Sequence, residues 1–134
     1  MPKKVLITED ETHIKALLVQ TLETAFEDYI DDEELEIFEA IDGEEGLQIA
    51  KQERPDLIFL DLMLPKKDGF EVCQEIKKDR RLKNTYIIML SAKGQAVDKK
   101  KGLAVGANEY VTKPFNPAII VSKVEEILGI KRTD

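Results

Sequence analysis

Polar and charged side chains directly follow four short apolar runs of this sequence. These side chains are Glu9 and Asp10, Asp61, Ser91 and Lys113. Carboxylates that lie close together repel one another, and their pKa values rise unless a cation lies between them. Hard oxygen ligands suit Mg²⁺, which often uses one or two carboxylates together with a phosphate. A lysine and a hydroxyl could then neutralise a phosphoryl group, and a carboxylate in such a site can itself be the nucleophile, forming an aspartyl phosphate.

The stretch that ends at Asp61 has the most distinct pattern. Leu57 to Leu60 is too short for a lone helix and lacks polar alternation, which predicts a fully buried strand over 56–60. Pro65 and the following Asp68-Gly69 break the run. Asp61 therefore lies at the carboxyl end of a buried strand, and ligands bind at that edge in open α/β sheets.

The rest of the chain alternates predicted strands with predicted helices. We expect strands at about 4–8, 35–40, 56–60, 86–90 and 109–111. We expect helices at about 12–29, 44–54, 70–78, 96–105 and 117–128. This alternation predicts an α/β fold, a doubly wound (βα)5 parallel sheet of order 2-1-3-4-5. The first and third strands are neighbours in that order, so Asp10 and Asp61 should face each other across a crevice.

Length and composition indicate one soluble domain over residues 1–134. Apolar residues make up 43% of the chain, and the net charge of -7 disfavours general nucleic-acid binding. The single cysteine, Cys73, cannot form an internal disulfide and is expected to be a small buried side chain. No apolar run approaches the roughly 20 residues of a membrane span, and no signal peptide is recognisable. We therefore expect a cytoplasmic protein with no membrane contact.

Five motifs, in order along the chain, resemble the receiver domain of two-component response regulators, the CheY-like family. They are Val5–Glu11, Leu60–Pro65 with Asp68-Gly69, Leu90–Lys93, Gly106–Tyr110 and Lys113–Phe115. The resemblance covers about residues 4–128, and each motif lies at a predicted strand end. It implies a single-domain receiver with the flavodoxin-like sheet described above.

The resemblance implies a role for each acidic residue. Asp61 would accept a phosphoryl group from a phosphohistidine, becoming 4-aspartylphosphate. Asp10 would bind Mg²⁺ directly, Glu9 would act through water, and Met63 would offer its backbone carbonyl. Glu9 stands where aspartate is also common in the family, and its extra methylene would shift the water around the metal.

The resemblance also implies how phosphorylation would be transmitted. Lys113 would pair with Asp61 before phosphorylation and with the phosphate afterwards, and the Lys113–Pro114 peptide bond would be cis. Ser91 would contact the phosphoryl oxygen. Tyr110 would turn inward as Ser91 moves. These changes would alter the surface formed by the predicted fourth helix, fifth strand and last helix.

The implied protein is a switch that catalyses its own phosphorylation and dephosphorylation rather than turnover of external substrates. Its expected partners are a sensor histidine kinase or phosphotransfer protein and a downstream target protein, with no direct nucleic-acid contact. It would be a monomer or a weak phosphorylation-dependent dimer. Two alternatives stay open: a receiver-like interaction module that is not phosphorylated, and a receiver fragment of a larger regulator.

Other functions fit the sequence less well. A haloacid-dehalogenase-type phosphatase uses Asp-x-Asp, but Met63 stands two residues after Asp61. A flavodoxin-like electron carrier needs a phosphate loop after the first strand, where Glu9 and Asp10 would repel a phosphate. No nucleotide-binding P-loop motif occurs. On their own, Glu9 and Asp10 could simply cap the first helix.

Overall fold

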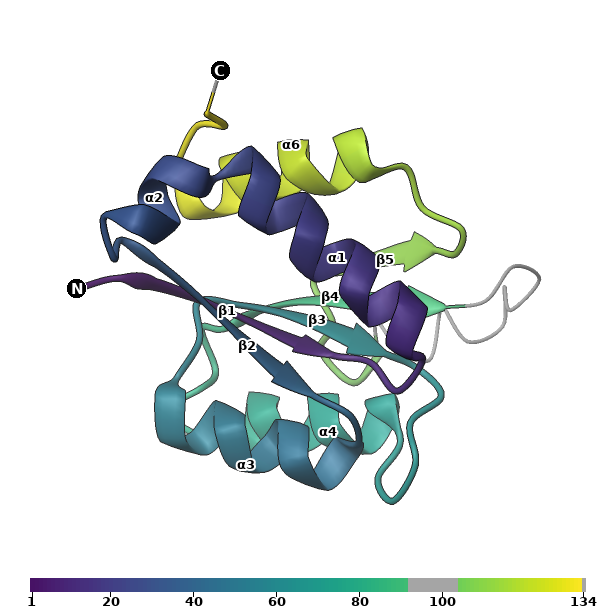
Figure 1. The fold of residues 1–134 in the computed structure, drawn as a ribbon. Helices are drawn as coiled ribbons and strands as arrows, with labels where there is room; N and C mark the ends of the chain where they lie inside the picture. The colour runs from purple at the N-terminus through teal and green to yellow at the C-terminus, as the bar shows by residue number, and fades with distance from the viewer. Residues whose placement is uncertain (92–103, 134) are drawn as a thin grey trace.

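A computed structural model describes residues 1–91 and 104–133 of the chain. Five parallel strands form one sheet in the order β2-β1-β3-β4-β5 (Figure 1), which confirms the predicted topology. The strands are β1 (Lys3–Thr8), β2 (Leu35–Ala40), β3 (Leu57–Asp61), β4 (Tyr86–Ser91) and β5 (Glu109–Thr112). All five predicted strands are present, and their ends differ from the predictions by one residue at most.

Helices cover both faces of this sheet. They are α1 (Thr12–Ala25), α2 (Glu27–Asp31), α3 (Gly43–Glu53), α4 (Gly69–Lys78) and α6 (Pro117–Leu128). Figure 1 shows α1, α2 and α6 over one face and α3 and α4 over the other. Almost all of the helix predicted over 96–105 lies outside the described residues. Among the described helices, none combines the length and the apolar character that crossing a bilayer requires.

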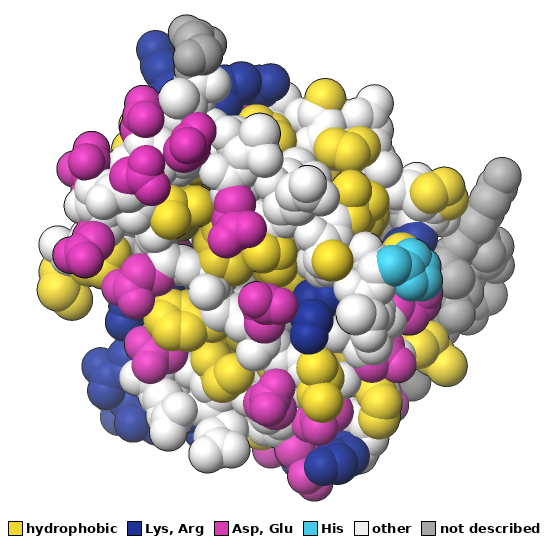
Figure 2. All heavy atoms as spheres, in the orientation of Figure 1, with side chains coloured by type: hydrophobic (Ala, Val, Ile, Leu, Met, Phe, Trp, Pro, Cys, Tyr) yellow, Lys and Arg dark blue, Asp and Glu magenta, His cyan; other side chains and the backbone are white. Residues whose placement is uncertain are grey.

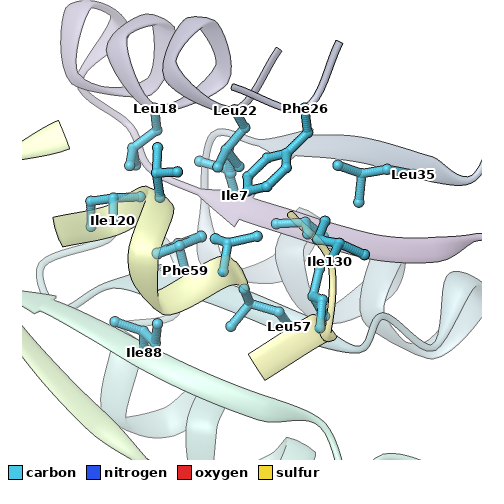
Figure 3. Close-up of a cluster of buried hydrophobic side chains, with 14 of the residues drawn as sticks. Ile7, Leu18, Leu22, Phe26, Leu35, Leu57, Phe59, Ile88, Ile120 and Ile130 are labelled. Carbon is cyan, nitrogen blue, oxygen red and sulfur yellow. The ribbon is translucent and has the colours of Figure 1, made fainter. Parts of the chain in front are cut away.

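Two apolar layers, one on each face, hold the sheet between the helices. On the first face, Leu18 and Leu22 of α1 and Ile120 of α6 pack onto Phe59 (Figure 3). The second layer joins β3 and β4 to α3 and α4. Every residue of β3 is buried, and burying one aliphatic side chain contributes about 1.5–3 kcal/mol. This packing fixes the position of the carboxylate at the end of β3.

The single helix predicted over 12–29 is wrong, because the chain breaks at Phe26. The backbone of Phe26 has φ -121° and ψ 35°, which ends α1 at Ala25 and lets α2 begin at Glu27. The Phe26 side chain is fully buried in the first apolar layer, and its ring packs edge-on against Tyr29. The helix is therefore interrupted at a residue whose side chain lies in the apolar core. The interruption also places a short helix, α2, in the acidic segment between α1 and β2.

A candidate magnesium and phosphoryl site

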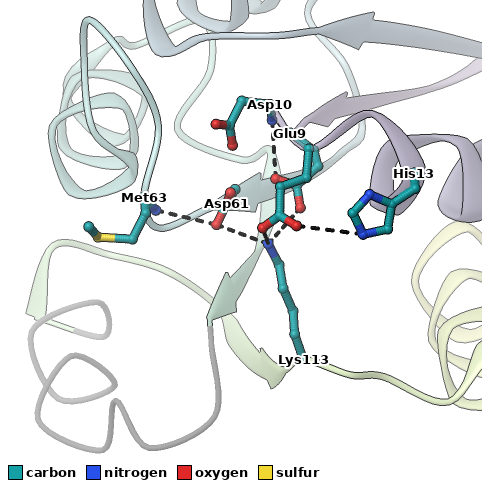
Figure 4. A network of polar contacts seen from close by, with 7 residues as sticks. Glu9, Asp10, His13, Asp61, Met63 and Lys113 are labelled. Atoms are coloured by element: carbon teal, nitrogen blue, oxygen red, sulfur yellow. Dashed lines mark hydrogen bonds and ion pairs between the residues drawn. The ribbon is translucent and has the colours of Figure 1, made fainter.

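The carboxylates of Glu9, Asp10 and Asp61 converge at the carboxyl edge of the sheet. Thr8, the last residue of β1, pairs in register with Leu60 of β3, so the residues that follow each lie at the same level. One oxygen from each of the three carboxylates lies within 4.8 Å of the others. Figure 4 shows these side chains pointing toward one another from β1 and β3.

The three carboxylates differ in burial. Glu9 is fully buried, Asp61 is 4% exposed and Asp10 is exposed. The first helix begins after Glu11, and that N-terminus has no side-chain cap. Glu9 and Asp10 therefore do not cap α1; Glu9 instead accepts a hydrogen bond from its neighbour's backbone N–H at 3.1 Å. Two buried acids beside an exposed third leave one open side through which a cation could enter.

Lys113, directly after β5, brings a positive charge into this acidic cluster. Its Nζ lies 2.6 Å from Glu9 Oε1, 3.4 Å from Asp61 Oδ1 and 3.8 Å from Glu11 Oε1. Burial alone would lower the pKa of Lys113, but the contacts with Glu9 and Asp61 outweigh it and raise that pKa. The Lys113–Pro114 peptide bond is cis. Sequence reasoning paired this lysine with Asp61 and missed the shorter contact with Glu9 and the third one with Glu11.

The buried position of Asp61 changes its acidity. Burial, followed by the neighbouring Glu9 carboxylate, raises the pKa of Asp61 to about 7. Lys113 and the backbone N–H of Met63, which donates to Asp61 Oδ1 at 3.3 Å, act in the opposite direction. A bound cation would favour the ionised carboxylate.

The other predicted residues lie at different depths. Ser91 ends β4 and is 2% exposed, and its backbone carbonyl accepts from the Lys113 N–H at 2.7 Å. Tyr110, on β5, is half-buried and packs against the second apolar layer. The Met63 side chain is 66% exposed beside the site. Glu9, Asp10, Asp61 and Lys113 therefore meet at this edge, and Ser91 and Tyr110 lie on the neighbouring strands β4 and β5.

We expect Gly69→Ala to disturb the segment that carries Asp61. A Cβ at position 69 would lie 2.4 Å from the Asp61 carbonyl oxygen and 2.9 Å from Leu62 Cα, both rigid backbone atoms. The free energy of unfolding, measured by denaturant titration, should fall by about 2 kcal/mol or more. Gln52→Ala, at an exposed position of α3, is the control and should change it by less than about 0.5 kcal/mol. Equal stabilities of the two variants would contradict this description of the backbone.

Comparisons with known sequences and structures agree on one protein family. The family model of the response regulator receiver domain matches residues 5–125. Vibrio cholerae chemotaxis response regulator CheY4 superposes with a TM-score of 0.79 and 31% identity, covering 95% of this chain and 99% of that one.

Two longer bacterial regulators are also similar in sequence. The alkaline phosphatase synthesis transcriptional regulatory protein PhoP of Bacillus subtilis is 44% identical over 96% of this chain and 49% of its own length. The DNA-binding dual master transcriptional regulator RpaA of Synechocystis is 42% identical over 100% of this chain and 51% of its own length. The chain thus spans about half the length of these relatives.

These relatives overturn one prediction from the sequence, that the protein makes no direct contact with nucleic acid. RpaA is named as DNA-binding, and PhoP as a transcriptional regulator. The prediction was based on the net charge of -7. That charge describes one receiver-sized unit, and it says nothing about the other half of a regulator twice as long. Net charge was therefore the wrong property from which to exclude DNA.

Proposed function

The chain belongs to the family of response regulator receiver domains of two-component systems, and from this premise we propose that it is a switch phosphorylated on Asp61. The phosphoryl donor would be the phosphohistidine of a sensor histidine kinase or a phosphotransfer protein. The observation that carries the proposal is the position of Asp61, buried at the end of β3 between Glu9, Asp10 and Lys113. We take residues 1–134 as one receiver domain.

The proposed reaction is an in-line transfer. An Asp61 carboxylate oxygen attacks phosphorus, the P–N bond of the phosphohistidine breaks, and the neutral imidazole leaves after taking up a proton. This requires an ionised Asp61, whose pKa of about 7 in the metal-free protein holds a proton on it part of the time. Deprotonating Asp61 is therefore one of the costs that the site must offset.

The donor set fits Mg²⁺. Three carboxylate oxygens lie within 4.8 Å of one another, and Asp10 is open to solvent. We propose that Glu9, Asp10 and Asp61 hold the ion with the Met63 backbone carbonyl, Asp10 directly and Glu9 through water. When bound, Mg²⁺ supplies positive charge that keeps Asp61 ionised and offsets charge on the phosphoryl oxygens.

Lys113 and Ser91 would then respond to the phosphoryl group. Lys113 Nζ is already 3.4 Å from Asp61 and would move from Glu9 toward the phosphoryl oxygens. The Ser91 hydroxyl would donate to another of these oxygens. The backbone N–H of Lys113 donates a hydrogen bond to the Ser91 carbonyl. We therefore propose that the structural response to phosphorylation passes to β5, where Tyr110 lies, and to α6.

The output we propose is control of transcription within a longer regulator, by analogy with the relatives named PhoP and RpaA. In that arrangement the receiver accepts the signal and another region contacts DNA. The shift of β5 and α6 would be the change that the other region detects.

Phosphoramidate tests the proposed function, because it carries its phosphoryl group on nitrogen, as a phosphohistidine does. We expect one phosphoryl group on the wild type in Mg²⁺, detected by phosphorus NMR and intact mass. Ser91→Ala should slow its appearance by about tenfold or more, since one donor to the phosphoryl oxygens is lost. Ser122→Ala, at an exposed position on α6, is the matched control and should react at the wild-type rate. Equal rates for the wild type and Ser91→Ala would remove Ser91 from the site.

Magnesium binding should depend on pH. Because the pKa of Asp61 is raised to about 7, a proton competes with the ion below that value. We expect the dissociation constant from calorimetric titration to increase by up to about tenfold for each pH unit below 7. Asp10→Asn should weaken binding at every pH, whereas Asp28→Asn, on α2 away from the site, should not. An affinity that is constant from about pH 5 to 8 would exclude Asp61 as a ligand.

A further inference from the structure

A groove runs along the outer side of β2, away from the phosphorylation site. It has a volume of about 630 Å³, and the residues that line it include Glu23, Ile30, Glu33, Glu36, Ile37 and Phe38. We refer to it as the β2 groove. Figure 2 shows apolar side chains interspersed with carboxylates over the side of the molecule where β2 and α2 lie.

The β2 groove lies at an open edge of the sheet. β2 is the first strand of the order and pairs with β1 alone among the described strands. An edge strand presents backbone N–H and C=O groups with which another strand can pair. Ile37 and Phe38 are both half-buried and pack against the apolar layers on opposite faces of the sheet. An added strand would cover both side chains at once.

The charge around the β2 groove indicates what could occupy it. Residues 27–36 contain seven of the chain's 27 acidic side chains and no lysine or arginine, so the remaining 20 acids equal the 20 basic residues in number. This ten-residue segment therefore carries the whole net charge of -7. Within residues 1–91 and 104–133, no ion pair is formed by Glu23, Glu33 or Glu36.

The negative charge of this segment excludes several kinds of binding partner for the β2 groove. Phosphate backbones and anionic membrane surfaces would be repelled by the segment 27–36. A second copy of this chain, paired through the same edge, would bring two segments of the same charge together. A basic protein segment is attracted instead. Lys4 Nζ lies 5.9 Å from the centre of the Phe38 ring, and its positive charge would repel other cations on that face. The cations of a bound segment should therefore extend to the other face, over Glu23 and Glu33.

We propose that the β2 groove binds an extended, basic segment of a partner protein, which adds to the sheet as a strand beside β2. Alternate side chains of the segment point to one face. Apolar side chains on the Phe38 face would cover that ring, and lysine or arginine side chains on the Ile37 face would reach Glu23 and Glu33. The backbone pairing provides affinity, and the carboxylates select basic sequences. This surface is independent of Asp61.

A short peptide in which lysine and valine alternate is the probe, followed through the amide NMR shifts of the intact chain. We expect the largest shifts within residues 23–38 and expect no binding by a peptide with glutamate in place of lysine. The double variant Glu23→Lys/Glu33→Lys should weaken binding by at least about tenfold, because two attractions become repulsions. Glu126→Lys, an exposed position on α6, makes the same type of charge change elsewhere and should bind as the wild type does.

A second peptide tests the added strand. N-methyl groups on alternate residues keep the charge of the probe but block its backbone pairing, so this peptide should bind at least about tenfold more weakly. Shifts confined to other regions, equal affinity of the Glu23→Lys/Glu33→Lys and Glu126→Lys variants, or full affinity of the methylated peptide would overturn the proposal. Thermal unfolding of each variant verifies that the fold is intact.

Discussion

Replacing Asp61 with asparagine should stabilise the metal-free protein by about 2 to 4 kcal/mol at about pH 8. The carboxylate is 4% exposed and lies beside the Glu9 carboxylate, and the pKa of Asp61 is raised from 3.8 to about 7. The ionised group is therefore less stable in the folded protein than in the unfolded chain. Asparagine keeps the shape and removes the charge. The higher value holds for a carboxylate fully shielded from solvent, and residual solvation gives the lower one.

The pH dependence of this gain follows from the direction of the pKa shift. Between about pH 4 and 7 the folded protein holds a proton on Asp61 that the unfolded chain has released. The wild type therefore loses stability as the pH rises through this window, and the asparagine variant does not. The two proteins should be equally stable near about pH 4 and differ most above about pH 7.

Denaturant unfolding across this pH range measures the difference. Asp10→Asn is the control, because Asp10 is exposed, and it should change the stability by less than about 1 kcal/mol. Saturating Mg²⁺ should reduce the gain of the Asp61 variant, since the ion offsets the charge that asparagine removes. An Asp61→Asn protein less stable than the wild type at about pH 8 would show that the carboxylate is stabilised, not strained, where it lies.

Lys113→Met should destabilise the metal-free protein by about 3 to 5 kcal/mol, the cost of removing one partner of a buried ion pair. Lys113 Nζ lies 2.6 Å from Glu9 Oε1, and Glu9 is fully buried. Without the ammonium, Glu9 and Asp61 face each other with no cation between them. Denaturant unfolding at about pH 7.5 measures the loss.

Two further variants test this explanation. Glu9→Gln in the Lys113→Met background should restore much of the stability, because it removes the buried charge that lost its partner. Lys123→Met breaks a partly exposed ion pair with Glu109 and should cost no more than about 1 kcal/mol. Mg²⁺ should also bind more tightly to Lys113→Met than to the wild type, since the ammonium no longer repels it. A loss below about 1 kcal/mol for Lys113→Met would contradict the description of a buried pair.

The fold was predictable because its three central strands, β1, β3 and β4, are largely buried on both faces. Val5–Ile7, Leu57–Leu60 and Ile87–Leu90 are unbroken apolar runs, which distinguish central parallel strands from amphipathic helices. The break at Phe26 was not predictable in this way. Helical periodicity continues through Ala25, Phe26 and Tyr29, and only the structure shows that the helix is interrupted at Phe26, whose buried ring packs edge-on against Tyr29.

For the candidate site, the sequence predicted which residues meet but not their charge states or pairing. The position of Asp61 at a strand end follows from the chain pattern alone. The pairing of Lys113 depends on atomic distances, 2.6 Å from its Nζ to Glu9 Oε1 and 3.4 Å to Asp61 Oδ1, and these distances and the full burial of Glu9 required the structure. The sequence also contained the excess of acid in residues 27–36, but its place beside an open strand edge required the structure.

Intact mass after incubation with acetyl phosphate tests the central claim, that Asp61 accepts a phosphoryl group with the help of Mg²⁺. The wild type should gain a single phosphoryl group in Mg²⁺ and none when the ion is chelated beforehand, and Asp61→Asn should gain none. Asp10→Asn should gain it more slowly. A folded wild-type protein that gains no phosphoryl group, or an adduct that persists in Asp61→Asn, would contradict the assignment of Asp61 as the phosphorylated residue.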